Sequence, residues 1–135
     1  MAAKVTLINA NWNPQAESLL MAAIGNNPSY TINELRNEVA SGTSRLVQVV
    51  EDGKPLGYVV YFIEVFGGGR ELVLQAGAAI SGDLGELRKA VPALANLARK
   101  AGAPTMRAHL GDAARMRLFK KAGFQLAEYV VRAGV

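Results

Sequence analysis

Three β-prone segments follow one another in the middle of the chain with only short connections between them. Arg45–Val50 and Leu56–Phe66 are separated by a turn at Glu51-Asp52-Gly53. Gly67-Gly68-Gly69 then separates Leu56–Phe66 from Glu71–Ile80. Two parallel neighbours need a crossover of a dozen or more residues, and these connections are too short for one. The three segments are therefore predicted to form an antiparallel meander.

Two helices are predicted before this meander. Asn13-Pro14 is typical of a helix start, with asparagine as the N-cap and proline at the first helical position. This helix is expected to end at Gly25. Thr31-Ile32-Asn33-Glu34 is a capping box, in which hydroxyl and carboxylate satisfy each other's exposed backbone donors. It opens a second helix that runs to about Ala40.

A β-α-β unit is predicted after the meander. Pro92 lies inside its first helix and predicts a kink or a shift in the start of that helix. The chain then has the order β-α-α-β-β-β-α-β-α-β, which predicts one domain over residues 1–135, of α/β class (α+β type) with a mixed sheet and helices on its faces. The remaining elements are expected at Lys4–Ala10 (strand), Leu84–Ala101 (helix, capped by Asp83 and Glu86 and closed by Gly102), Thr105–Leu110 (strand), Ala113–Ala122 (helix, ended by Gly123) and Phe124–Val131 (strand).

The central strand is largely apolar on both of its faces, as expected for a strand that is covered on both sides. Side chains alternate along a strand, so Tyr58, Val60, Phe62 and Glu64 share one face, and Val59, Tyr61, Ile63 and Val65 share the other. The aromatic residues Trp12, Tyr58, Tyr61, Phe62 and Phe66 are expected to pack in the core.

Composition narrows the class of protein. The chain has no cysteine, which excludes disulfides, thiolate metal ligands and a cysteine nucleophile. No apolar run approaches the roughly 20 residues that span a bilayer. The first ten residues have no long apolar stretch of the kind found in a signal peptide. We therefore expect a cytoplasmic protein without membrane partners.

Charge is distributed unevenly along the chain. Residues 1–87 hold five Lys/Arg against nine Asp/Glu, a balance of −4, whereas residues 88–135 hold ten against two, a balance of +8. A basic half suits an anionic ligand or an acidic protein surface, and a solvated helix face is the alternative. The basic residues that could contact phosphates or a partner are Arg107, Arg115, Arg117, Lys120 and Lys121.

Two stretches resemble the GNAT (GCN5-related N-acetyltransferase) superfamily, which has the acyl-CoA N-acyltransferase fold. Asp112–Phe124 is similar to a late helix of that family, which an asparagine begins and in which Leu-Tyr precedes a charged pair and Gly-Phe. Glu51–Tyr58 is similar to the hairpin that leads into the family's third strand. The order of elements agrees from about Gln15 onward. The resemblance implies a GNAT-like, divergent or degenerate member that transfers an acyl group from acetyl-CoA or another acyl-CoA to a small-molecule or peptide amine.

The resemblance also implies where the acyl donor binds. Backbone groups of Val73–Ala78 would bind the pantetheine arm, and a loop over Gly82–Leu87 would hold the pyrophosphate through backbone N–H groups. The loop keeps Gly85 of the family pattern, but Asp83 and Glu86 place carboxylates where an anion should bind. The donor-site candidates are Val73, Leu74, Gln75, Ala76, Gly82, Asp83, Leu84, Gly85, Glu86, Leu87 and Phe119.

Candidate catalytic residues are few. Glu64 and Glu71 lie on strands where the family usually puts a general base, although solvated glutamates are the alternative for both. Phe119 stands where many members carry a tyrosine that protonates the leaving thiolate, and phenylalanine has no proton to give. His109 is the single histidine, and no carboxylate is spaced to complete a metal site with it.

Two further functions compete with acyl transfer. A catalytically inactive binding or structural module would explain the altered phosphate loop, with a second copy of the chain or an acidic protein as partner. Such reduced proteins occur among phage and mobile-element products, which is an analogy. Nucleic-acid binding has less support, because no basic motif here is interleaved with aromatic residues.

Overall fold

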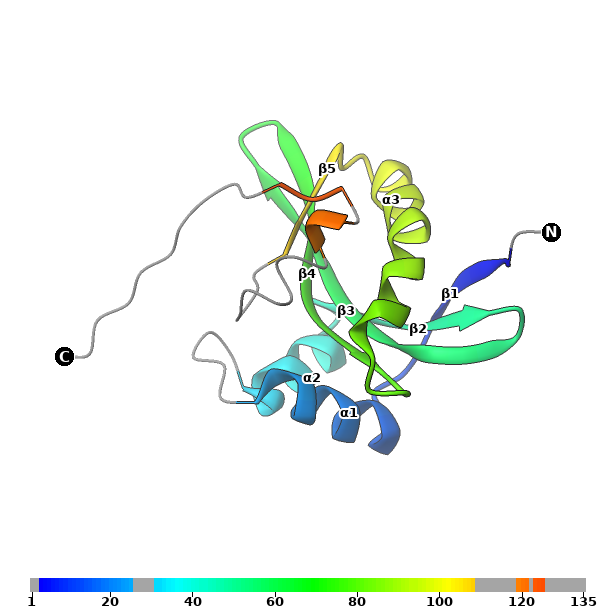
Figure 1. Cartoon of the computed structure of the whole chain (residues 1–135). Coiled ribbons are helices and arrows are strands. Elements are labelled where there is room, and N and C mark those ends of the chain that lie inside the picture. The colour runs from blue at the N-terminus through cyan, green and yellow to red at the C-terminus, as the bar shows by residue number, and fades with distance from the viewer. Residues whose placement is uncertain (1–2, 26–30, 109–118, 122, 126–135) are drawn as a thin grey trace.

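The computed structural model describes residues 3–25, 31–108, 119–121 and 123–125. In this part of the chain, the strands form one five-stranded sheet in the order β1-β2-β3-β4-β5. The first four strands pair antiparallel, and β4 pairs with β5 in parallel (Figure 1). The predicted meander and the mixed sheet are confirmed. The strands are β1 (Val5–Asn9), β2 (Arg45–Glu51), β3 (Lys54–Phe66), β4 (Gly69–Ala79) and β5 (Thr105–Ala108).

The turn between β2 and β3 follows its sequence. Asp52 and Gly53 have φ angles of 48° and 83°. Positive φ at both central residues belongs to a type I′ turn, whose twist matches that of the strands it joins. Asp52 also accepts a hydrogen bond of 2.9 Å from the backbone N–H of Lys4, so the turn holds the start of the neighbouring strand β1.

The first two helices, α1 (Pro14–Ile24) and α2 (Ile32–Ser41), begin at the residues predicted from the sequence. Asn13 Oδ1 accepts from the backbone N–H of Ala16 at 2.9 Å, and Thr31 Oγ1 accepts from that of Glu34 at 3.2 Å. Each cap satisfies a donor that the first helical turn leaves without an intrahelical partner.

The long helix predicted over Leu84–Ala101 is two elements. A 3₁₀ helix, η1 (Leu84–Ala90), leads directly into an α-helix, α3 (Val91–Lys100). Pro92 lies in the first turn of α3, where its missing N–H has no intrahelical acceptor to lose. The shift in the start of the α-helix, one of the two outcomes predicted from Pro92, is confirmed.

The two faces of the sheet pack against different helices (Figure 1). Tyr58 and Val60 pack with Leu20 of α1 and Leu35 of α2. The alternate residues Val59 and Tyr61 pack on the other face, with Leu94 and Ala98 of α3 among their neighbours. This alternation is the one predicted for β3.

Phe66 is an exception to the predicted core. The structure leaves it 51% exposed at the end of β3, and the neighbouring Val65 is 71% exposed. The prediction that Phe66 packs in the core is therefore wrong, because the tip of the β3–β4 hairpin extends beyond the helices that cover the sheet.

A helix end at Gly123 is confirmed. The N–H of Gly123 donates to Lys120 and that of Phe124 to Phe119, with Gly123 at φ 98°. This is the Schellman pattern, which a hydrophobic contact usually accompanies. Here the rings of Phe119 and Phe124 meet edge to face, with centroids 5.0 Å apart. Predictions that concern His109, Asp112, Arg115, Arg117 and most of Phe124–Val131 lie outside the described residues.

Candidate functional site

The loop between β4 and η1 uses its own backbone donors. The N–H of Gly82 donates to the carbonyl of Ala79 at 3.0 Å, and that of Asp83 to Ser81 Oγ at 3.2 Å. Asp83 then accepts twice: its side chain from Gly85 N–H at 2.8 Å and its carbonyl from Glu86 N–H at 3.0 Å. Four donors in the segment expected to hold a pyrophosphate are thus bonded within the loop.

Asp83 lies close to the backbone of Gly85. A Cβ at Gly85 would come within 3.0 Å of Asp83 Oδ1, which is tighter than ordinary van der Waals contact. The glycine that matches the family pattern therefore makes room here for a carboxylate of the same chain. This geometry does not fit a pyrophosphate, because the donor that would bind it is occupied by another anion.

Leu87 and Glu86, at the end of this segment, both contact residues outside it. Leu87 packs against the core on the α3 side, and a Cβ at Gly77 would lie 3.2 Å from its Cδ1. Lys89 Nζ lies 3.3 Å from oxygens of both Glu51 and Glu86. These hydrogen bonds, Glu51 first, raise the pKa of the Lys89 ammonium. Leu84 is the first residue of η1.

The middle of β4 carries a bulge at Gln75. Val60 pairs with Ala76 and Tyr61 with Leu74, so Gln75 is one extra residue opposite β3. Its side chain is held: Nε2 donates to Glu38 Oε2 of α2 at 2.8 Å, and Oε1 accepts from Ser44 Oγ at 2.6 Å. Ser44 is buried. No short-range pattern predicts this contact, because Gln75 lies 31 positions from Ser44 and 37 from Glu38.

The candidates on β4 fall into two groups. Val73 and Leu74 are buried and lie in the stretch Glu71–Leu74 that pairs with β5. Gln75 and Ala76 come after the last described pair, and β4 continues to Ala79.

Both candidate glutamates belong to one ionic cluster. Glu64 and Glu71 face each other across β3 and β4. Arg107 of β5 reaches both, with Nη2 2.8 Å from Glu64 Oε2 and Nη1 2.9 Å from Glu71 Oε1. Thr105 Oγ1 donates to the second oxygen of Glu71 at 2.8 Å. Arg107, one of the basic residues that could contact phosphates or a partner, is paired here with two carboxylates of its own chain.

Phe119 lies against the α3-side core and packs on Phe124.

Among the described residues, no group of three His, Asp or Glu side chains could hold a metal ion. In the same part of the chain, no helix is long and apolar enough to cross a membrane.

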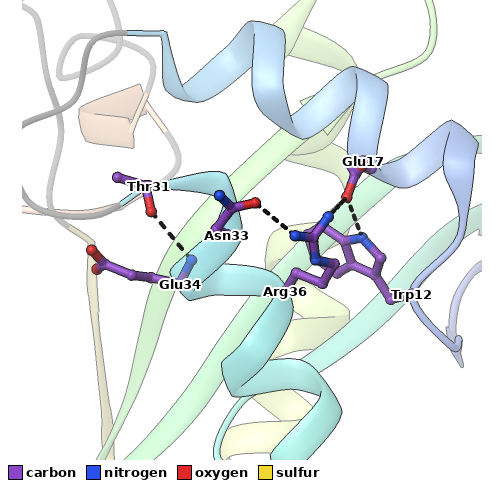
Figure 2. Close-up of polar contacts among 6 residues, drawn as sticks. All are labelled: Trp12, Glu17, Thr31, Asn33, Glu34 and Arg36. Atoms are coloured by element: carbon purple, nitrogen blue, oxygen red, sulfur yellow. Dashed lines mark hydrogen bonds and ion pairs between the residues drawn. The ribbon is translucent and has the colours of Figure 1, made fainter.

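Helices α1 and α2 are joined by a polar contact around Glu17 (Figure 2). Glu17 Oε1 accepts from Trp12 Nε1 at 3.0 Å and from Arg36 Nη1 at 2.6 Å. Arg36 Nη2 also donates to Asn33 Oδ1 at 2.6 Å. The hydrogen bond from Trp12, and next the one from Arg36, lower the pKa of the Glu17 carboxyl, because both favour its charged form.

Solved structures share this arrangement over nearly the whole chain. A putative acetyltransferase from Pyrococcus furiosus matches with a TM-score of 0.72 and 10% identity, covering 98% of this chain and 100% of its own. The chain has the GNAT acetyltransferase fold. The sequence itself matches no family model and no curated protein.

Two further GNAT-fold structures carry bound molecules. An aminoglycoside N-acetyltransferase in complex with CoA matches with a TM-score of 0.65 and 11% identity, covering 100% of this chain and 97% of its own. An aminoglycoside acetyltransferase from an uncultured soil metagenomic sample, in complex with sisomicin, matches with a TM-score of 0.67 and 12% identity, covering 98% and 95%.

Proposed function

We propose that this protein transfers an acyl group from a pantetheine thioester, such as acetyl-CoA, to an amine. The observation that carries this proposal is the bulge of β4 at Gln75, where one extra residue interrupts the regular pairing with β3. A bulge interrupts the ladder of a sheet, and an extended amide-bearing ligand can bind a strand there through main-chain hydrogen bonds. The fold shared with acetyltransferases, one of them in complex with CoA, supports this reading.

Gln75 and Ala76 are the residues we assign to the pantetheine arm. The extra residue at Gln75 lies between the pairs that Leu74 and Ala76 form with β3, so the ladder is irregular at this point. The Ser44–Gln75–Glu38 contact fixes the side chain of the bulge residue and so holds the backbone beside it in one arrangement.

The reaction is a direct displacement. The amine nitrogen attacks the thioester carbonyl carbon, a C–N bond forms and the C–S bond breaks. The amine loses one proton and the leaving thiolate gains one. Phe119 has no proton to give, so we propose that water protonates the thiolate.

Glu64 is the better placed of the two candidate bases. Both oxygens of Glu71 already accept hydrogen bonds, from Thr105 and Arg107. Glu64 is held by Arg107 through Oε2, and no described residue donates to its Oε1. A base must reach the proton that it takes, directly or through one water. We therefore expect Glu64→Gln to lower the rate of transfer more than Glu71→Gln.

Calorimetry with acetyl-CoA and acetyl-pantetheine tests the donor assignment. Binding of either ligand is expected, followed by thiol release when an amine is added. No heat of binding with either ligand at millimolar concentration would overturn the proposal. A panel of polyamines, aminoglycosides and peptide amines then identifies the class of acceptor.

A second candidate is a catalytically inactive module that binds a second copy of the chain or an acidic protein. The observations that favour it are the internally bonded loop around Asp83 and the ion pairs of both glutamates. Size-exclusion chromatography with light scattering distinguishes the candidates. A strict monomer that releases thiol from acetyl-CoA counts against this module.

A further inference from the structure

The side chain of Asp83 places a carboxylate at the start of η1. Its side chain accepts the N–H of Gly85 at 2.8 Å, while its own N–H is bound by Ser81. In a donor site of the GNAT kind, backbone N–H groups at this place would receive a phosphate oxygen. The carboxylate of Asp83 therefore stands in the place of that oxygen.

Three neighbouring features hold the carboxylate of Asp83 in this position. Asp83 is the N-cap of η1, and η1 leads directly into α3. The loop before it is closed by Gly82, whose φ of 81° favours glycine and whose N–H binds Ala79. The missing side chain of Gly85 leaves the space in which the carboxylate lies.

Within residues 3–25, 31–108, 119–121 and 123–125, the acidic side chains of this loop are Asp83 and Glu86. Glu86, three positions along, is paired with Lys89. Among the described residues, no cation forms an ion pair with Asp83. A polyanionic ligand that approached this loop would therefore meet a negative charge as well as an occupied donor.

We propose that Asp83 closes the loop to pyrophosphate, so that the acyl donor is recognised by its pantetheine arm and acyl thioester alone. The inference rests on the proposed function, because it concerns the donor of that reaction. The ligand class is a pantetheine thioester, whether carried by CoA or by a smaller group. The nucleotide end of CoA then adds little to affinity.

Calorimetry on the full chain compares acetyl-CoA with acetyl-pantetheine. The wild type is expected to bind the two with dissociation constants that differ by less than about fivefold. Asp83→Ala removes the charge and frees the N–H of Gly85, and is expected to tighten acetyl-CoA about tenfold while acetyl-pantetheine is unchanged. Asp83→Asn keeps the cap and loses the charge, so its gain should be smaller. If the alanine variant folds poorly, Asp83→Asn still tests whether the charge of Asp83 weakens the binding of acetyl-CoA.

Glu34→Gln is the matched control. Glu34 is an acidic residue in the first turn of α2, at a helix start elsewhere in the molecule. Its removal should leave the ratio of the two affinities unchanged. A wild type that prefers acetyl-CoA by more than about fivefold overturns the inference, as does an equal gain in the control variant.

A second readout separates this inference from the donor assignment. In a ¹⁵N correlation spectrum, millimolar inorganic pyrophosphate should leave the amide signals of Gly85 and Glu86 unmoved in the wild type and shift them in Asp83→Ala. If neither thioester binds, the donor assignment fails and this spectrum alone decides about the loop. Signals that move in the wild type would show that the loop is open.

Discussion

The hydroxyl of Ser44 donates a hydrogen bond of 2.6 Å to Oε1 of Gln75, the extra residue in the bulge of β4. Ser44 is buried and directly precedes β2, which lies on the other side of β3 from β4. This bond therefore links the bulge in β4 to the start of β2. A serine hydroxyl carries one hydrogen, which is shared here with Glu38 at 3.1 Å. The bulge is thus held by a residue remote in sequence.

Ser44→Ala is expected to lower the free energy of unfolding by about 1–2 kcal/mol, because it leaves a partly buried amide oxygen without its donor. Urea unfolding measures this. Ser41→Ala is the control: its hydroxyl bonds the exposed carbonyl of Glu38, and its loss should cost less than about 0.5 kcal/mol. Equal losses in the two variants would contradict a special role for Ser44.

Gly57→Ala is expected to destabilise the chain by about 2 kcal/mol or more. A Cβ at this position would lie far inside van der Waals contact with the carbonyl oxygen of Ala78, and backbone atoms cannot give way cheaply. Gly69→Ala is the matched change on the next strand, where the Cβ would meet the ring of Phe66 at 3.1 Å. Phe66 is half exposed and can rotate, so the control should cost less than about 1 kcal/mol. Thermal melts of both variants check the difference.

Arg107→Met is expected to lower the free energy of unfolding by about 1–2 kcal/mol, since it leaves Glu64 and Glu71 as like charges on directly opposed positions. The three side chains are partly exposed, which keeps the value modest. Adding Glu64→Gln to the variant should restore part of the loss. A double-mutant cycle that shows no coupling between positions 64 and 107 would contradict the ionic cluster.

Glu17→Gln is expected to weaken the dependence of stability on pH in the acid range. The pKa of the Glu17 carboxyl is lowered from its ordinary value of 4.5, first by the hydrogen bond from Trp12. A lowered pKa in the folded state means a contribution that is present above pH 4.5 and is lost as the pH falls through the folded value. Melting temperatures between neutral and acid pH measure the slope for both proteins.

Fluorescence offers an independent check on this contact. Trp12 is the single tryptophan, and its indole N–H donates to Glu17. The emission should change with pH in the wild type as the carboxyl gains its proton, and much less in Glu17→Gln. Glu34→Gln is the control, because no described cation pairs with that carboxylate. Identical titrations of all three proteins would count against the contact.

Short-range signals predicted the chain well. Asn13, Thr31 and Gly123 end or begin helices as expected, because each acts on backbone groups within about one turn of itself. Asp52-Gly53 forms the expected tight turn for the same reason. Each of these residues forms its cap or turn in any fold in which the adjoining helix or strand is present.

Predictions about burial and charge depended on neighbours that sequence does not give. Phe66 was expected in the core, but nothing in its own strand reveals that the hairpin extends past the helices. The sequence predicts Glu64 and Glu71 as separate candidate bases, whereas their shared partner Arg107 follows from the parallel register of β5.

The sequence by itself determined the order of elements from β1 to β5, the caps and turns, and the capping carboxylate of Asp83 at the start of η1, because the signals for each lie within a few residues. The tertiary structure alone decided that Gln75 forms the bulge and that Arg107 joins two glutamates. The bulge and the ionic cluster depend on strand register and on which face a helix covers, and both are set by packing across the whole sheet.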